Sequence, residues 1–232
     1  MADGTLTPRA QARLDTIEQI KEIARGHLAE DGPNLSLRAV ARDLGVVSSA
    51  VYRYFGSRDE LLTALILDAY TALADYVETA EAAVARRDLA GRWTAVGRAA
   101  REWALDNQHE YALLYGSPVP GYEAPEDTIE PANRPVALAL QILRDGLERG
   151  TVEVPSDRLP KPVRTDLDGI REVAGFEDLP APLLGRAMTM WALLFGTISF
   201  ELFGRLTNGV TDYDTYFEHQ LKVMTRYLGL SK

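Results

Sequence analysis

Residues 35–62 read LSLRAVARDLGVVSSAVYRYFGSRDELL, and this stretch decides the fold. Ser36 is a good helix N-cap, and apolar residues then recur at spacings of three and four as far as Leu44. Gly45 closes this short helix, because glycine adopts positive φ at little steric cost. A second short apolar segment begins soon afterwards at Val51. Two short helices joined by a tight glycine turn predict a helix-turn-helix.

Helical patterns flank this stretch on both sides. Upstream, apolar side chains between Leu14 and Leu28 recur on one helical face. The polar residues 1–12 before them are expected to form a mobile arm. Downstream, Ser57 and Glu60 have the spacing of a capping box, which predicts that a long helix follows. A helix-turn-helix head of three helices therefore occupies the start of the chain.

The rest of the sequence also predicts helices and shows no alternation typical of strands. Four further helices are expected, over residues 93–107, 131–149, 183–206 and 213–228. Residues 150–180 carry several prolines and predict a long irregular connection. We therefore predict an all-α chain, in which a three-helix helix-turn-helix head is fused to a larger helical domain for ligand binding and dimerisation. The predicted domains are residues 1–60 and residues 61–232.

Composition and charge narrow the function. The 232 residues contain no cysteine, which excludes disulfides and thiolate metal sites. We find no apolar run near the ~20 residues that span a bilayer, so we expect a cytoplasmic protein without a membrane partner. The net charge is −9, yet the first sixty residues hold 8 basic and 9 acidic side chains. DNA contact must therefore come from a local arrangement in this nearly neutral segment.

The second helix of the motif, predicted over residues 48–55, carries the DNA-reading chemistry. In a helix-turn-helix this helix enters the major groove, and its first residues face base edges. Ser48 and Ser49 are small and let the backbone approach the bases closely. Tyr52 and Tyr54 have hydroxyls that can donate to phosphates, although an isolated tyrosine is more often a core residue.

Residues 35–62 resemble the DNA-binding signature of the TetR family, from the two short helices to the start of the next helix. The resemblance implies an Ω-shaped all-α homodimer with DNA-binding heads and a variable effector domain, joined through its last two helices. It implies phosphate contacts from Ser36, Tyr52, Tyr54 and Arg58, and base contacts from Arg38, Ser48 and Ser49.

The chain departs from the family pattern at two positions. Val47 stands where the family usually has a small polar residue, which weakens the cap on the recognition helix and leaves open a methyl contact to thymine. Trp191, Phe195 and Gly196 are similar to the tryptophan–histidine–glycine pattern of one subgroup of TetR C-terminal domains. Phenylalanine replaces the histidine, so a polar role is not expected at that position.

Aromatic residues around the proline-rich segment and in the apolar helix 183–206 are the candidate effector contacts. Packing is the alternative interpretation for each of them. A mostly apolar cleft with a few polar tips would suit an apolar or aromatic small molecule. The predicted effector-binding residues are Trp103, Tyr111, Leu114, Tyr115, Trp191 and Phe195.

Two other classes of function were weighed. An enzyme is disfavoured, because His27, His109 and His219 lack metal-ligand spacing and the chain has no phosphate-binding glycine loop or nucleophile elbow. A helical interaction adaptor without DNA-binding activity is the alternative, and the salt dependence of DNA binding would distinguish it. We predict a repressor that binds a palindromic operator as a dimer, needs no cofactor, and is released by a small molecule.

Overall fold

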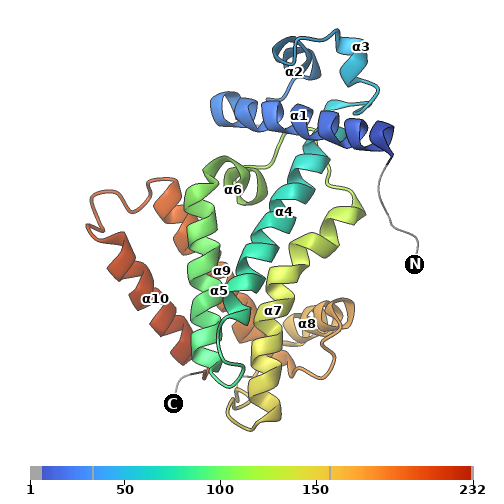
Figure 1. The fold of residues 1–232 in the computed structure, drawn as a ribbon. Coiled ribbons are helices and arrows are strands. Elements are labelled where there is room, and N and C mark those ends of the chain that lie inside the picture. The colour runs from blue at the N-terminus through green and yellow to red at the C-terminus, as the bar shows by residue number, and fades with distance from the viewer. Residues whose placement is uncertain (1–6, 33, 157, 231–232) are drawn as a thin grey trace. The chain divides into compact units, whose positions relative to one another are not determined.

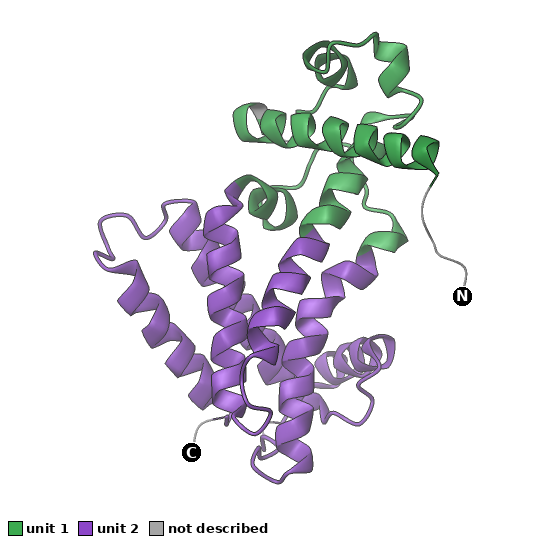
Figure 2. Cartoon of the chain, viewed as in Figure 1, with its two compact units in different colours: residues 1–69, 109–128 green, residues 70–108, 129–232 purple. Residues whose placement is uncertain are grey.

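The computed structural model describes residues 7–32, 34–156 and 158–230. Within these ranges the chain forms ten α-helices and one short 3-10 helix, with no strand (Figure 1). The predicted all-α class is confirmed. The helices divide into two compact units, residues 1–69 with 109–128 and residues 70–108 with 129–232 (Figure 2). The predicted functional boundary after residue 60 stays a prediction, since these units are defined by packing.

The first unit contains the helix-turn-helix. Its elements are α1 (Pro8–Asp31), α2 (Leu37–Asp43), α3 (Ser48–Val51), the start of α4 (Arg58–Ala82), α6 (Gln108–Tyr115) and η1 (Glu126–Thr128). Helix α1 packs against α2, and α2 packs against α3. Ile20, Val40 and Val51 are fully buried among them. The predicted apolar face of α1 belongs to this core from Ile20 to Leu28, whereas Leu14, where the predicted face begins, is 45% exposed.

The ends of α2 follow the sequence signals closely. The Ser36 hydroxyl accepts a hydrogen bond from the backbone N–H of Ala39 at 3.4 Å, as an N-cap does. At the other end, Gly45 has φ of 74°, and the N–H of Val46 donates to the carbonyl of Ala41 at 3.0 Å. This is a Schellman ending, which requires a left-handed residue after the helix. The predicted glycine turn is confirmed.

Helix α1 begins earlier than predicted. Thr7 caps it by accepting a hydrogen bond from the N–H of Ala10 at 3.2 Å, and Pro8 occupies the first turn. Proline is favoured there because its fixed φ suits a helix and its missing N–H is not needed. The prediction of an arm over residues 1–12 is therefore wrong from residue 7 onward, and its first six residues lie outside the described part of the chain.

The recognition helix is shorter than predicted, while the start of α4 matches its capping signal. Helix α3 ends at Val51 rather than at residue 55. The hydroxyl of Ser57 accepts from the N–H of Glu60 at 3.1 Å. The carboxylate of Glu60 accepts in return from Gly56 at 2.7 Å, one residue before the position that the predicted capping box uses.

The second unit is a bundle built around α5. Its elements are the remainder of α4, α5 (Leu89–Asp106), α7 (Ile129–Glu148), α8 (Lys161–Ala174), α9 (Ala181–Leu202) and α10 (Tyr213–Tyr227). Helix α5 packs against α7, α9 and α10. Gly97 allows the close approach of α10, because a β-carbon there would collide with Leu221. The four helices predicted for this region are present with small shifts in their ends.

The sequence analysis missed two helices, one within a proline-rich segment and one directly before another. Residues 150–180 were predicted as an irregular connection, but α8 occupies residues 161–174 of it. Pro162 lies in the first turn of α8, where proline favours a helix, and Gly175 ends it with φ of 71°. Helix α6 likewise precedes the prolines that follow residue 116. Prolines lie at helix boundaries here, and the prediction wrongly treated the residues between them as irregular.

Helix α9 corrects the prediction that no segment is apolar enough to cross a membrane. Among the described residues it alone has the required length and composition, with a mean hydropathy of 1.3, and 44% of its most apolar stretch is buried. The signal is weak, because a core helix of a soluble protein passes the same test. Two of its apolar residues, Leu193 and Phe200, are not buried in the core, since they are 38% and 55% exposed.

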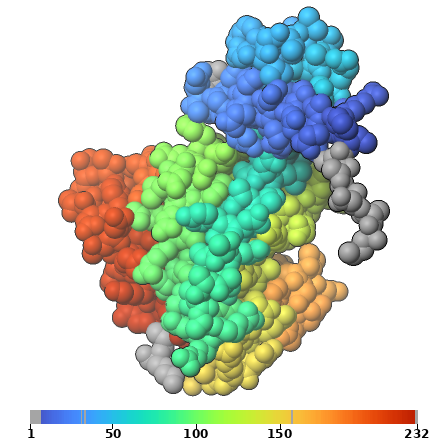
Figure 3. Space-filling model, in the orientation of Figure 1, coloured from blue at the N-terminus to red at the C-terminus, as the bar shows by residue number. Residues whose placement is uncertain are grey.

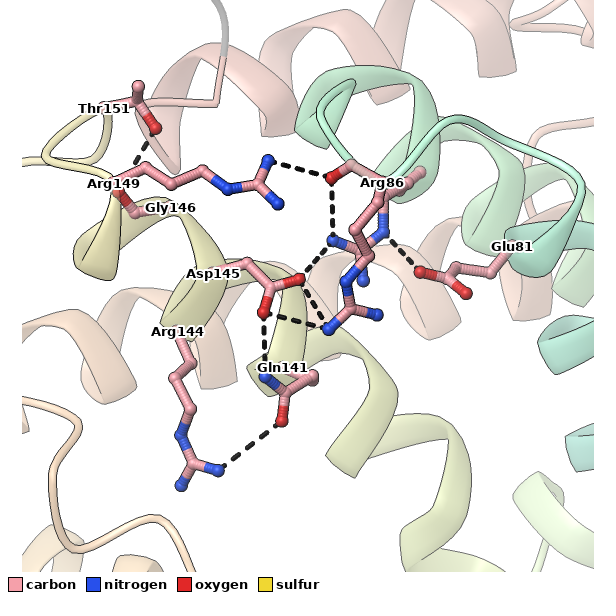
Figure 4. Close-up of polar contacts among 9 residues, drawn as sticks. Glu81, Arg86, Gln141, Arg144, Asp145, Gly146, Arg149 and Thr151 are labelled. Carbon is pink, nitrogen blue, oxygen red and sulfur yellow. Dashed lines mark hydrogen bonds and ion pairs between the residues drawn. The ribbon is translucent and has the colours of Figure 1, made fainter.

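A buried cluster of charges joins three helix ends in the second unit (Figure 4). Arg92 is fully buried and donates hydrogen bonds to Glu81 and, at 2.6 Å, to Asp145. Arg86 and Gln141 donate to the same Asp145 carboxylate at 3.0 and 2.9 Å. The cluster therefore connects the end of α4, the start of α5 and the end of α7.

Candidate DNA-binding site and effector residues

The segment that contains α3 has one buried and one exposed face. Val51 is 0% exposed and Phe55 is 7% exposed, so both belong to the core. Val47 and Tyr52 point the other way, at 71% and 46% exposure, and Ser49 is exposed as well. Phe55 is thus a core aromatic, whereas Tyr52 is exposed. Of the predicted base contacts on this segment, Val47 and Ser49 are exposed, whereas Ser48 is half-buried.

The residue before α3 has the backbone conformation of a helix N-cap, but its side chain cannot accept a hydrogen bond. Val47 is the N-cap, with φ of −70° and ψ of 144°, and no side chain accepts from the first turn. Ser48 does not replace it, because Ser48 is already the first helical residue and is half-buried. The isopropyl group of Val47 therefore stands exposed at the helix end that is predicted to meet the bases.

The other predicted phosphate contacts lie at neighbouring helix starts. Ser36 and Arg38 are exposed at the start of α2. The Ser36 hydroxyl accepts a bond in the cap and keeps its own O–H for a further acceptor. Arg58 is half-buried at the start of α4, with its guanidinium 3.9 Å from Asp59. Backbone N–H groups and the helix dipole favour anions at both places.

A hydrogen bond between His27 and Asp43, which the sequence analysis missed, connects α2 to α1. The Nε2 of His27 lies 2.7 Å from the Oδ2 of Asp43, and Arg42 donates to the other oxygen at 3.0 Å. Hydrogen bonds from Arg42 and then from His27 hold the pKa of Asp43 below its usual value. The two partners are sixteen residues apart, so sequence spacing gives no signal for the pair.

The predicted effector residues fall into two groups. Tyr111, Leu114 and Tyr115 lie on α6 in the first unit, where the rings of the two tyrosines are 5.1 Å apart. Trp191 and Phe195 lie on α9 in the second unit, with their rings 4.7 Å apart. Each group contains one pair of aromatic rings in tilted contact, and effector contact stays a prediction for all of these residues.

Trp103 and one unpredicted tryptophan belong to the core of the second unit. Trp103 is 5% exposed and Trp93 is 1% exposed, both on α5. The indole N–H of Trp93 has no hydrogen-bond acceptor among the described residues. A buried donor without an acceptor lowers the stability of a fold by about 1–3 kcal/mol. A ligand atom that accepts a hydrogen bond from Trp93 would recover part of this free energy. Nothing in the apolar periodicity of α5 distinguishes Trp93 from an ordinary core residue.

Comparison with known proteins assigns both parts of the chain to one family. Residues 20–65 match the family described as bacterial regulatory proteins, tetR family. Residues 93–224, more than half of the chain, match the tetracyclin repressor-like C-terminal domain. The first match contains the helix-turn-helix, and the second lies mainly in the second unit.

Relatives match over nearly the whole length. The HTH-type transcriptional regulators Rv1816 of Mycobacterium tuberculosis and Mb1846 of Mycobacterium bovis are each 40% identical over 230 residues, covering 96% of this chain and 98% of theirs. The crystal structure of SCO4313 is 37% identical, with a TM-score of 0.76 over 94% of this chain and 98% of that chain. The TetR family regulator PfmR of Thermus thermophilus shares the fold, at 21% identity and a TM-score of 0.59 over 89% and 97% of the chains. The chain belongs to the TetR family of ligand-responsive, DNA-binding transcriptional regulators.

Proposed function

We propose that this regulator is a repressor that binds a palindromic operator as a homodimer and releases it when a small apolar or aromatic molecule binds. The exposed face of the α3 segment carries this proposal. Val47, Ser49 and Tyr52 point away from the core, although Val51 and Phe55 of the same segment are buried. These exposed side chains are not needed for the core, so they are available to contact bases and phosphates.

The proposed DNA contacts divide by chemistry. Phosphate contacts come from Ser36, Tyr52, Tyr54 and Arg58, and contacts to base edges come from Arg38, Val47, Ser48 and Ser49. Phosphate contacts fix the position on the duplex, whereas base contacts specify its sequence. Val47 would favour a thymine methyl group, because it offers an exposed apolar surface and no hydrogen-bonding atom.

Dimerisation through α9 and α10 is supported by an apolar face on α9. Met188, Leu193, Phe200 and Phe203 are each between 38% and 55% exposed. Gly196 lies on the same helix, and a β-carbon built there meets no atom within 4 Å. A second copy of α9 would bury this face at about 25 cal/mol per Å². The two-fold symmetry of such a dimer suits a palindromic operator.

The proposed effector contacts in the second unit are Trp103, Trp191 and Phe195, with Trp93 added as a polar partner. The contacts proposed in the first unit are Tyr111, Leu114 and Tyr115 of α6. The indole N–H of Trp93 would donate to an acceptor atom on the effector. RolR, which has the same fold, was crystallised with resorcinol, an aromatic molecule that carries such acceptors. We further expect a cytoplasmic location and regulation without catalysis.

The first experiment is selection of genomic fragments by the purified protein at about 50 and about 200 mM salt. We expect enrichment of a short palindrome that weakens steeply with salt, and loss of this enrichment in Tyr52→Phe and Arg38→Ala. Arg87→Ala is the matched control, since Arg87 is an exposed arginine in the second unit. Absence of any enrichment by a folded protein would favour the helical adaptor instead.

Tryptophan fluorescence tests the effector proposal. All three tryptophans, Trp93, Trp103 and Trp191, lie in the second unit, so the signal reports on that unit alone. A panel of phenols and fused aromatic compounds should contain one that quenches the emission and releases the selected duplex. Trp93→Phe keeps the aromatic volume and removes the N–H, and it should weaken binding by roughly tenfold. Quenching without release of DNA would contradict the switch.

A further inference from the structure

The basic side chains of α1 form ion pairs in the second half of the helix but not in the first half, among the residues that the structure describes. In the second half, Lys21 pairs with Glu18 at 2.7 Å and with Asp68 at 2.8 Å. Arg25 pairs with Glu22 and with the same Asp68, both at 2.9 Å. The positive charges in this half of α1 are therefore neutralised within the first unit.

The first half of α1 leaves its cations unneutralised. Arg9 and Arg13 are exposed, and neither forms an ion pair with any residue that the structure describes. Asp15 is close in sequence, but its carboxylate accepts a hydrogen bond from Gln11 at 2.8 Å. Arg9 and Arg13 are four residues apart and share a helix face, where like charges repel. An anion placed against this face would relieve the repulsion.

Arg13 also lies against a proposed DNA contact. The guanidinium carbon of Arg13 is 5.1 Å from the centre of the Tyr54 ring, in a cation–π arrangement. Tyr54 is half-buried just beyond α3. A cation–π contact does not use the N–H donors of the guanidinium in hydrogen bonds to the ring, so these donors stay available for oxygen acceptors. Tyr54 and Arg13 can therefore offer a hydroxyl and a guanidinium to one phosphate.

The start of α1 lies on the same surface of the first unit as the helix-turn-helix. The dark-blue start of α1 and the lighter blue α2 and α3 form one continuous surface of the first unit (Figure 3). Arg38 and Arg53 are exposed on the helix-turn-helix and also form no ion pair with a described carboxylate. The unpaired arginines thus come from α1 as well as from the motif.

We propose that Arg13 is a DNA phosphate contact that also positions Tyr54, and that Arg9 extends the phosphate-binding surface by one helical turn. This inference rests on the proposed DNA contact of Tyr54. It places part of the operator-binding surface on α1, outside the helix-turn-helix and outside the residues that the family signature identifies. The ligand is the backbone of duplex DNA, whatever its base sequence.

The test measures duplex affinity as a function of salt. The probes are a duplex selected from a random pool by the wild-type protein and a scrambled duplex of equal length. Each lost phosphate contact reduces the slope of log affinity against log salt by about 0.9. Arg13→Ala and Arg9→Ala should each show this reduction per protomer, with an affinity loss of about threefold to tenfold that is equal on both duplexes. Arg87→Ala is the control and should change neither quantity.

A double-mutant cycle tests the positioning role. Tyr54→Phe removes the hydroxyl and keeps the ring, so its cost should be smaller when Arg13→Ala is already present. Arg13→Lys keeps the charge but loses the planar group, and it should keep the salt slope while losing this coupling. Circular dichroism melting of each variant confirms that the exposed substitutions leave the fold intact.

Three results would overturn the proposal in distinguishable ways. If Arg13→Ala matches Arg87→Ala while Tyr52→Phe still weakens binding, α1 is not a phosphate contact and the DNA-reading proposal survives. If the costs of Arg13→Ala and Tyr54→Phe simply add, Arg13 does not position Tyr54. If the wild-type protein selects no duplex, the proposed function fails and the inference fails with it.

Discussion

The two compact units use arginine for opposite purposes. In the second unit, Arg92 is fully buried between Glu81 and Asp145, and its ion pairs with both carboxylates connect the ends of three helices. In the first unit, Arg9 and Arg13 stay exposed and unpaired among the described residues. An internal ion pair favours a fixed arrangement, whereas an unpaired surface cation attracts an external anion. Arg92 therefore stabilises the second unit, whereas we propose that Arg9 and Arg13 of the first unit bind DNA phosphates.

The net charge of −9 conceals this difference. A protein that binds phosphates does not need an excess of positive charge, because binding depends on the charges within about 10 Å of the duplex. Carboxylates can dominate elsewhere, provided that they do not neutralise the arginines on the binding face. The four predictions below test this contrast between the units, beginning with the largest effect.

Arg92→Ala should produce the largest loss of stability. Removing the guanidinium leaves the buried Glu81 without its cation and leaves Asp145 with only Arg86 and Gln141, and breaking a buried pair in this way costs about 3–5 kcal/mol. Urea unfolding followed by tryptophan fluorescence measures the loss. The matched control is Arg98→Ala on the same helix, where the side chain is 52% exposed and pairs with Glu218. The control should lose less than about 1 kcal/mol, and equal losses would contradict the buried-cluster argument.

Acidification should weaken the same cluster. Burial alone raises the pKa of Asp145, but hydrogen bonds from Gln141 and Arg92 and the nearby positive charges outweigh it and hold the pKa below its ordinary value. A carboxyl group with a lowered pKa in the folded state contributes stability above the unfolded pKa of about 3.9, and loses it as pH falls through the folded value. The free energy of unfolding should therefore fall in this acidic range.

Asp145→Asn separates this carboxyl group from the many others that titrate in acid. The variant should be less stable at pH 7 and should show a shallower decline of unfolding free energy below about pH 4. Asp214→Asn is the control, because the Asp214 carboxylate is 86% exposed although it lies 2.8 Å from Arg101. An unchanged acid profile in Asp145→Asn would show that the cluster does not depend on this ionisation.

Gly45→Ala should weaken the head by about 1 kcal/mol, because alanine is strained at a φ of 74°. Gly26→Ala provides a control of opposite sign. Gly26 lies in the middle of α1 with open space around its β-carbon position, so alanine should stabilise it by about 0.5–1 kcal/mol. Thermal unfolding monitored by circular dichroism measures whether each variant is more or less stable than the wild type. A stabilising Gly45→Ala would show that the Schellman turn is not required.

Val47→Ser should produce the smallest change, a gain of about 0.5–1 kcal/mol in head stability. The N-cap position of α3 already has the extended backbone of a capped helix and lacks only the accepting oxygen. Val46→Ser, at an exposed neighbouring position, should give no gain. In the DNA selection, Val47→Ser should also relax any thymine preference. An unchanged preference would remove Val47 from the base contacts.

The local signals in the sequence were sufficient for the helix-turn-helix. Ser36, Gly45 and Ser57 act on their own neighbours through caps and turns, and each has the predicted role in the structure. Local signals failed where a proline starts a helix, as at Pro8 and in α8, because the same residue also ends helices. The exposed face of α3 follows from the motif, whereas the extent of α3 does not.

By itself, the sequence determined the all-α class, the position of the helix-turn-helix and the family, because helix periodicity and capping depend on residues a few positions apart. Only the tertiary structure decided which charges are buried and which are free. Arg92 and Asp145 are 53 residues apart, and Arg13 and Tyr54 are 41 residues apart. Such pairs form when packing brings distant segments together, and no spacing rule within one helix predicts them.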